Sequence, residues 1–463
     1  MVIDGDNQQN WIHKIVNSLM EQIRKGKRLI LFPLPLQGRI NPMLELANVL
    51  HFRGFSITIL HTNFNSLNPS NHPHFTFHSI PDGLSETETS TKSHMLLVSC
   101  LNANCHDPFR NCLANLLSDD GSEEPIACLI TDPLFDFTRS VAKSLNLPRM
   151  LLRTGSATST TVFAAFPLLW EKGYLPKQES QLEEPVVELP PLKVKDLPMN
   201  SGDPKIFYQL VTELANEVKT KDGVIFNTSE DLEEQALLTI RQDFPIPIFP
   251  IGPFHKWFPT SYSSSLLSED ESCISWLNTQ APKSVVYVSF GSTAAVNEAQ
   301  FLEIAWGLAN TNQPFLWVVR PGLLQGSEWL EKLPQGYLEA LDGKGHIVKW
   351  APQKKVLAHP AVGLFWTHNG WNSTLESISE GVPMVCVPIF ADQMLNARYV
   401  SDVWRVGLQL ENGIKRDEIE KTIRKLMTEK EGEEIKDKMS KLKEKTNLSL
   451  RRWLFIPILG WLG

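Results

Sequence analysis

Short apolar runs alternate with helical patterns along most of this chain. The runs are residues 28–35, 56–60, 127–132, 149–154 and 223–228 in the first half and 284–290, 314–320, 346–350, 363–368 and 383–389 in the second. Strands separated by helices usually form a parallel sheet that is flanked by those helices. The alternation therefore predicts an α/β protein, and its recurrence in both halves predicts two Rossmann-like domains.

The length of the chain and a change in composition predict where these domains divide. A chain of 463 residues is too long for one ordinary core and suits two domains of about 200 residues or more each. Residues 243–270 are rich in proline and serine, a composition typical of a linker. The predicted segments are a polar N-terminal extension (1–26), an N-terminal domain (27–242), the linker (243–270), a C-terminal domain (271–450) and an apolar tail (451–463).

Composition limits the partners and the compartment that we expect. A net charge of −8 argues against a nucleic-acid partner, because an extended phosphate backbone requires a basic surface. The six cysteines include no Cys-x-x-Cys pair, which favours reduced thiols. Residues 1–28 lack the apolar stretch of a signal peptide, and no charge-free apolar run before the tail is long enough to span a bilayer. We therefore expect a cytoplasmic protein without stable membrane insertion.

Residues 350–393 combine the parts needed to hold a nucleotide diphosphate and a sugar. The stretch starts with an aromatic side chain, and its His-Asn-Gly-Trp-Asn-Ser-Thr run (368–374) leads into a helical pattern. A turn of this kind directs free backbone N–H groups and the positive end of the helix dipole at one point, which suits a diphosphate. Asp392 and Gln393 follow a buried strand and offer the carboxylate and amide that sugar hydroxyls require. This combination predicts transfer of a sugar from a nucleotide sugar.

The stretch resembles the donor-binding box of the plant family-1 UDP-glycosyltransferases and matches that box without a gap. The similarity extends from about Lys27 to about Leu450. Within the family, the sequence resembles those of the branch that glucosylates iridoids, diterpenoids and other small plant metabolites. The resemblance implies the fold called GT-B, with the donor in the C-terminal domain and the small-molecule acceptor in the N-terminal domain. The terminal Gln393 implies UDP-glucose as the donor.

The resemblance also implies a role for each donor-site residue. Trp350 would stack on uracil, and Glu376 would bind the ribose hydroxyls. The residues implied at uracil and ribose are Trp350, the Ala351 backbone, Gln353 and Glu376; those at the phosphates are Ser292, His368, Asn372 and Ser373; those at glucose are Thr154, Trp371, Asp392 and Gln393. Taken singly, Trp350 and Trp371 also fit core positions, and Asp392 also fits a helix N-cap.

The catalytic position departs from the family pattern. Inverting transfer to an alcohol requires a base, which in the family is a histidine after the first strand, held by an aspartate of a later strand. Asp132 matches the aspartate, but Arg39 stands in the place of the histidine. Because a guanidinium stays protonated and has no acceptor lone pair, Arg39 cannot be a general base. We expect it to form an ion pair with Asp132.

Loss of general-base catalysis typically costs about a hundred- to ten-thousand-fold in rate. Three hypotheses follow: a weakened enzyme, an enzyme for acceptors that are already anionic, such as carboxylates, or a catalytically silent binder of UDP-sugar or aglycone. The intact donor box favours an enzyme over a binder. It disfavours a further alternative, another GT-B activity such as transfer to a lipid or protein, or epimerisation.

Three further expectations concern the acceptor, cofactors and assembly. The apolar residues Leu134, Phe135 and Ala391 are expected to line the acceptor pocket, with a core role as the alternative. No Asp-x-Asp pair lies near a plausible site, so we expect neither a metal ion nor another cofactor. We expect a monomer. The tail, 451–463, departs from the family's usual ending, and its apolar side chains predict poor solubility or association.

Overall fold

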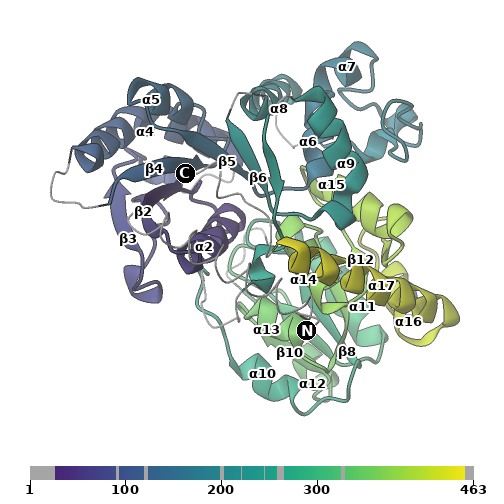
Figure 1. Ribbon diagram of the computed structural model, residues 1–463. Coiled ribbons are helices and arrows are strands. Elements are labelled where there is room, and N and C mark those ends of the chain that lie inside the picture. The colour runs from purple at the N-terminus through teal and green to yellow at the C-terminus, as the bar shows by residue number, and fades with distance from the viewer. Residues whose placement is uncertain are drawn as a thin grey trace, which may run out of the picture.

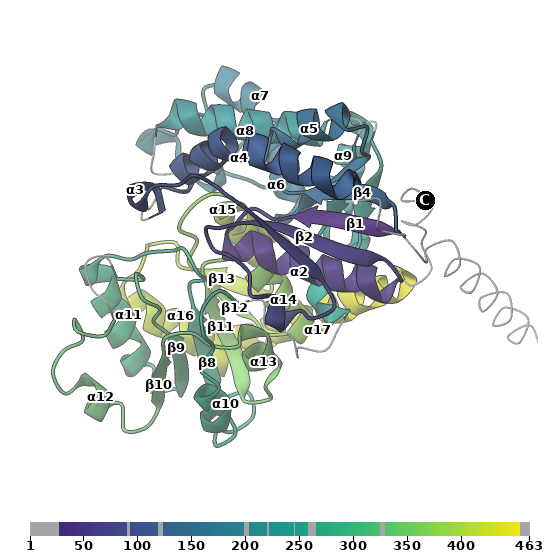
Figure 2. The same cartoon turned by 90° about the vertical axis from the view of Figure 1, so that its left-hand side faces the viewer.

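The computed structural model describes residues 27–453, apart from 90–92, 119–123, 199–202, 220–221, 245, 258–264 and 325–328, with side chains described up to residue 450. The predicted extension (1–26) lies outside the described residues, as does most of the predicted tail (451–463). Two parallel sheets flanked by helices form the two halves of the molecule, and Figure 2 shows one half lying above the other. Within the described ranges, none of the helices combines the length and apolar character that a bilayer crossing requires.

The N-terminal sheet has seven parallel strands in the order β3-β2-β1-β4-β5-β6-β7 (Figure 1). The strands are β1 (Arg28–Phe32), β2 (Ser56–Thr62), β3 (Thr76–Ile80), β4 (Ile126–Thr131), β5 (Arg149–Arg153), β6 (Gly223–Phe226) and β7 (Ile248–Pro250). The α-helices of this half are α2 (Gln37–Phe52), α3 (Glu86–Thr89), α4 (His94–Leu117), α5 (Thr138–Ser144), α6 (Ala157–Ala164), α7 (Phe166–Glu171), α8 (Pro204–Val218) and α9 (Glu230–Asp243).

The C-terminal sheet has six parallel strands in the order β10-β9-β8-β11-β12-β13. The strands are β8 (Val285–Ser289), β9 (Phe315–Val318), β10 (Gly345–Val348), β11 (Val362–Thr367), β12 (Met384–Cys386) and β13 (Gly407–Gln409). The α-helices are α10 (Ser272–Leu277), α11 (Glu298–Asn310), α12 (Tyr337–Ala340), α13 (Gln353–Ala358), α14 (Trp371–Glu380), α15 (Gln393–Arg398), α16 (Arg416–Thr428) and α17 (Lys430–Trp453).

Strand β1 shows why the central strands are continuously apolar. Successive side chains of a strand point to opposite faces of the sheet. Leu29 and Leu31 pack in a cluster with residues of α2, whereas Ile30 and Phe32 pack in another with residues of α4. Because helices cover both faces, each position must be apolar. The predicted α/β architecture with two Rossmann-like halves is therefore confirmed.

The order of strands reverses once in each sheet, between β1 and β4 in the N-terminal half and between β8 and β11 in the C-terminal half. Loops diverge where the order reverses and leave a crevice at the carboxyl ends of the strands, where ligands of such sheets bind. Arg39 and Asp132 follow β1 and β4, while Ser292 and His368 follow β8 and β11. The topology thus places the predicted site residues at both crevices.

The last described helix connects the two halves. Helix α17 packs against α14 of the C-terminal half and against α9 of the N-terminal half (Figure 1). The Ser449 hydroxyl of α17 donates a hydrogen bond to the carboxylate of Asp231 in α9. Helix α17 therefore contacts both halves of the molecule.

Every predicted strand is present, but β3, β7 and β13 were not expected from the sequence. All three lie at an edge of their sheet. Strand β7 falls inside the predicted linker, 243–270, and pairs with β6. The N-terminal sheet therefore continues past the predicted boundary, because a short edge strand in a proline-rich segment lacks the long apolar run of an interior strand.

Candidate functional site

A cavity of about 530 Å³ lies between the two halves, at the carboxyl ends of both sheets. Residues that follow β1, β4 and β5 line it from one side, and residues that follow β8, β10, β11 and β12 line it from the other. The predicted site residues that line it are Arg39, Leu134, Thr154, Ser292, Trp350, Ala351, Gln353, His368, Trp371, Asn372, Ser373, Glu376, Ala391, Asp392 and Gln393. Two predicted residues, Asp132 and Phe135, are absent from this lining.

His368 lies at the beginning of α14, held between two glycines. A Cβ atom at Gly291 or at Gly370 would come within 2.6 Å of its imidazole ring, so both positions require glycine. Burial, with a further contribution from the charge of Arg320, lowers the pKa of His368 to about 4. The ring is therefore neutral at physiological pH. Its Nδ1 atom is buried and has no hydrogen-bond partner among the described residues. The His368 side chain lines the cavity beside the N-terminus of α14, where anions bind favourably.

Gln353, Ser373 and Glu376 form a polar group on the same side of the cavity. The Gln353 amide donates hydrogen bonds to Ser373 Oγ at 2.9 Å and to Glu376 Oε2 at 2.7 Å. Burial raises the pKa of Glu376 to about 7, although the nearby charge of Lys354 opposes the shift. The carboxyl group is therefore close to half ionised at neutral pH, and a ligand hydroxyl that donates to it favours the ionised form.

Trp350 and Trp371 occupy different surroundings. The Trp350 indole N–H donates to Ser265 Oγ at 2.8 Å, and the ring is only partly buried. The Trp371 indole N–H is buried and donates to the Asn227 backbone oxygen of the N-terminal half at 2.8 Å. Trp371 also belongs to a core cluster of the C-terminal half, as the alternative interpretation from the sequence expected, and it lines the cavity as well.

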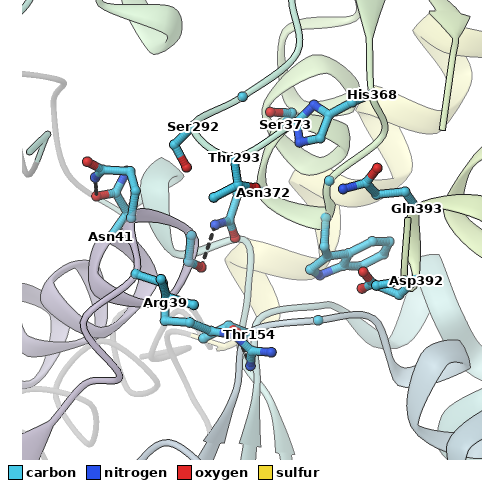
Figure 3. Close-up of a pocket in the computed structure, with 18 of the residues that line it drawn as sticks. Arg39, Asn41, Thr154, Ser292, Thr293, His368, Asn372, Ser373, Asp392 and Gln393 are labelled. Carbon is cyan, nitrogen blue, oxygen red and sulfur yellow. Dashed lines mark hydrogen bonds between the residues drawn. The ribbon is translucent and has the colours of Figure 1, made fainter. Parts of the chain in front are cut away.

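The pair Asp392 and Gln393 enters the cavity from the beginning of α15. Asp392 occupies the N-cap position, but its side chain forms no capping hydrogen bond to the helix backbone. A Cβ atom at Gly155 would lie 3.2 Å from Asp392 Oδ2, so glycine allows this carboxylate to approach the opposite half. The Gln393 amide oxygen accepts from the backbone N–H groups of Ile389 and Phe390 at 2.9 and 3.1 Å, and its NH₂ end points toward the cavity (Figure 3).

Arg39 forms an ion pair with Asp132 on the side of the cavity that belongs to the N-terminal half. Its Nη1 atom lies 3.4 Å from Asp132 Oδ2 and donates to Thr154 Oγ1 at 2.8 Å. Figure 3 shows Arg39 beside Thr154. Asp132 Oδ1 accepts from the Leu134 backbone N–H at 2.9 Å. The side chain of Arg39 is 24% exposed and lines the cavity, whereas that of Asp132 is only 1% exposed and does not.

An apolar wall from the N-terminal half completes the cavity. Its residues come from helices α4, α6 and α8 and from the segment after β4: Met95, Val98, Leu134, Phe163, Phe207, Leu210, Val211 and Leu214. Phe135, which we expected beside Leu134 in this wall, is fully buried and stacks on Phe32 with ring centroids 4.3 Å apart. The expectation for Phe135 is corrected: the backbone turns after Leu134, so the next side chain enters the core.

Sequence reasoning missed several residues of the site. The wall residues of α4, α6 and α8 look like ordinary core positions in the sequence, and only the amphipathic pattern of α8 offered a signal. It also missed Ser265, which lies in the predicted linker and holds the indole of Trp350. No group of His, Cys, Asp and Glu residues in the described parts of the chain is arranged to hold a metal ion.

Comparisons with known proteins agree with this geometry. Residues 28–448 match the family described as UDP-glucoronosyl and UDP-glucosyl transferase. The chain is 52% identical over 432 residues to UDP-glycosyltransferase 76B1 of Arabidopsis thaliana, covering 93% of this chain and 96% of that protein. It is 46% identical over 443 residues to UDP-glycosyltransferase 76G1 of Stevia rebaudiana, covering 94% and 96%. Phytolacca americana UGT2 complexed with UDP-2fluoro-glucose and pterostilbene has a similar structure, with a TM-score of 0.76 and 28% identity, covering 91% of this chain and 95% of that one.

Proposed function

Since the chain belongs to the plant family-1 UDP-glycosyltransferases and has their GT-B fold, we propose that it transfers glucose from UDP-glucose, with inversion, to a hydroxyl or carboxyl group of a small, largely apolar plant metabolite. Terpenoids, iridoids and phenolics are the proposed acceptors. One observation carries the proposal: a single cavity joins the polar donor residues of the C-terminal half to the apolar wall of the N-terminal half. The proposed enzyme is a cytoplasmic monomer that uses no metal ion or other cofactor, as predicted from the sequence.

The donor half of the cavity supplies groups suited to each part of UDP-glucose. The N-terminus of α14 and the neutral imidazole of His368 suit the diphosphate, because free N–H groups and the helix dipole stabilise the charge that develops on the leaving UDP. Trp350 offers its ring to the uracil, and Glu376 offers a carboxylate to the ribose. Asp392 and the NH₂ end of Gln393 suit the hydroxyls of glucose.

In the transfer step, an acceptor oxygen attacks the anomeric carbon from the face opposite the diphosphate. The bond between that carbon and the diphosphate oxygen breaks, and UDP leaves with the electron pair. An alcohol must also lose its proton, which Arg39 cannot accept. The halves of the cleft hold the reactants together and exclude water, so part of the rate enhancement survives without a base.

A catalytically silent binder of UDP-sugar or aglycone remains the second candidate. The observation that favours it is the position of Arg39, which occupies both Asp132 and Thr154. Such a protein would bind UDP as the enzyme does but would form no glucoside from any alcohol or acid. Product analysis with UDP-glucose and a panel of acceptors distinguishes the two candidates.

Replacing Trp350 by alanine is expected to weaken UDP binding by about ten- to a hundred-fold, because stacking of a base on an aromatic ring contributes about 1–3 kcal/mol. Calorimetry with UDP measures the change. Trp350→Phe is the matched control: it removes the hydrogen bond to Ser265 but keeps a ring face, so most of the affinity should remain. Unchanged affinity in Trp350→Ala would reject this donor site.

UDP binding is expected to strengthen as the pH rises through about 7, the pKa of Glu376. Ribose hydroxyls donate to the carboxylate, so binding favours ionisation, and below that pH the ligand must first displace a proton. Affinity should fall by about tenfold per pH unit below the pKa. Calorimetry at pH 6 and pH 8 should therefore show proton release at the lower pH only. Glu376→Gln is the control, because its pH profile contains only the titration of UDP itself. If UDP binding to this variant had the same pH profile as binding to the intact protein, the pH dependence would not come from Glu376.

A further inference from the structure

The guanidinium of Arg39 has hydrogen-bonding capacity that the described residues do not use. An arginine carries five N–H groups, and the hydrogen bonds of Arg39 to described residues both come from Nη1. One of them, to Asp132, is long at 3.4 Å. Because the side chain lines the cavity and is 24% exposed, the other N–H groups are accessible to a ligand.

A second arginine, Arg153, lies close enough to Arg39 for their charges to interact. Arg153 is fully buried, and its Nη1 atom has no hydrogen-bond partner among the described residues. Burial, followed by the charge of Arg39, lowers its pKa to about 10, so it remains protonated at physiological pH. Asp132 and Asp392 lie near both arginines, and Glu233 lies near Arg153, so these carboxylates offset the positive charge. Glu233 already accepts hydrogen bonds from the backbone N–H groups of Ala157 and Thr158. Asp132 is already shared with the Leu134 backbone, and Asp392 is assigned to the glucose.

The apolar wall begins beside this charged group. Leu134 lies two residues after Asp132, and the wall continues along α4 and α8 through Met95 and Leu210. A ligand that fits both features has an apolar body and one anionic, planar end. A carboxylate is such an end, because its two oxygens match the fork of a guanidinium.

We propose that Arg39 is an acceptor-binding residue that selects apolar carboxylic acids, so that the protein forms glucose esters in preference to glucosides. The inference rests on the proposed function. In the step, a carboxylate oxygen forms a bond to the anomeric carbon, the bond from that carbon to the diphosphate breaks, and UDP takes the electron pair. The acid enters without its proton, so no base is needed. The arginine that disables transfer to alcohols thereby orients the acceptor that does not require a base.

The test compares an acid and an alcohol with the same skeleton, 4-phenylbutanoate and 4-phenylbutanol. The intact protein is expected to have the higher kcat/KM for the acid and to give a product that hydroxylamine cleaves. Arg39→Gln should lower kcat/KM for the acid by about ten- to a hundred-fold, the usual effect of removing hydrogen bonds to a charged group, and should not lower it for the alcohol. Arg139→Gln, at a mostly exposed arginine outside the cavity lining, is the matched control and should change neither.

Equilibrium binding separates failure of this inference from failure of the proposed function. If the intact protein does not bind UDP, the proposed donor site is rejected. The role of Arg39 is then still tested by comparing the affinity of the acid for the intact protein with its affinity for Arg39→Gln. If UDP binds but the acid has no advantage over the alcohol, in turnover or in binding, the inference is wrong and the donor site stands. The inference is also wrong, and the donor site also stands, if Arg39→Gln leaves the preference for the acid unchanged.

Discussion

Replacing Arg39 by histidine is expected to raise glucose transfer to alcohols and phenols by about a hundred- to ten-thousand-fold, the range that general-base catalysis contributes. The rest of the catalytic pair is already in place. Asp132 is buried beneath this position, and its Oδ1 atom is held by the Leu134 backbone N–H at 2.9 Å. A carboxylate in contact with imidazole fixes the tautomer and stabilises the imidazolium that forms during proton transfer. Arginine provides neither a lone pair nor a proton-accepting state.

Product formation at saturating UDP-glucose measures this gain. The double variant Arg39→His with Asp132→Asn should lose most of it, because the imidazole loses its charged partner. Arg39→Gln should show no gain in transfer to alcohols, since it removes the guanidinium without supplying a base. The gain should also increase as the pH rises through about 6.5, the ordinary pKa of histidine. A histidine variant that binds UDP normally but gains nothing on alcohols would show that this position is not where the acceptor reacts.

Burial on both faces explains which strands could be predicted from the sequence. Strands β1, β4, β8 and β11 lie inside their sheets, so most of their positions are apolar and each forms a recognisable run. The missed strands β3, β7 and β13 lie at edges and are partly exposed. An edge strand needs fewer apolar positions, so its sequence resembles that of a loop.

The polar and the apolar sides of the cavity differ in the same way. The polar residues from Trp350 to Gln393 follow strands β10, β11 and β12 of one sheet and have types that suit a nucleotide sugar, so the sequence could predict that they lie together. The apolar wall combines residues from helices far apart in the sequence, which nothing distinguishes from core residues. Leu134 and Phe135 show the limit: the first lines the cavity and the second stacks in the core, and only tertiary packing separates them.

Replacing Asp196 by alanine is expected to lower the free energy of unfolding by about 3–5 kcal/mol, because it removes the buried one of the three carboxylates that pair with Arg398. Asp196 ends the short helix η3 (Val194–Asp196) of the N-terminal half, and Arg398 ends α15 of the C-terminal half. Their side chains are 2% and 4% exposed, and two hydrogen bonds of 2.9 and 3.1 Å join them. Such a two-point arrangement is the strongest form of this ion pair.

Thermal and denaturant-induced unfolding measure how far Asp196→Ala lowers the free energy of unfolding. Asp437→Ala is the control, since its carboxylate pairs with Lys441 on an exposed helix face and should contribute little. Asp196→Leu combined with Arg398→Met should recover much of the stability, because removing both charges removes the cost of burying one of them alone. An unchanged transition in Asp196→Ala would show that Asp402, 2.8 Å from Arg398, suffices to neutralise it.

The same pair also tests whether the two halves must be held together for transfer. Helix α15 begins at Gln393, so the ion pair at its other end connects the sugar side of the cavity to the N-terminal half. UDP contacts are expected mainly from the C-terminal half, so Asp196→Ala should bind UDP normally below its unfolding temperature. Transfer needs donor and acceptor in one geometry, so kcat should fall. If stability falls while kcat does not, the pair stabilises the fold without positioning the reactants.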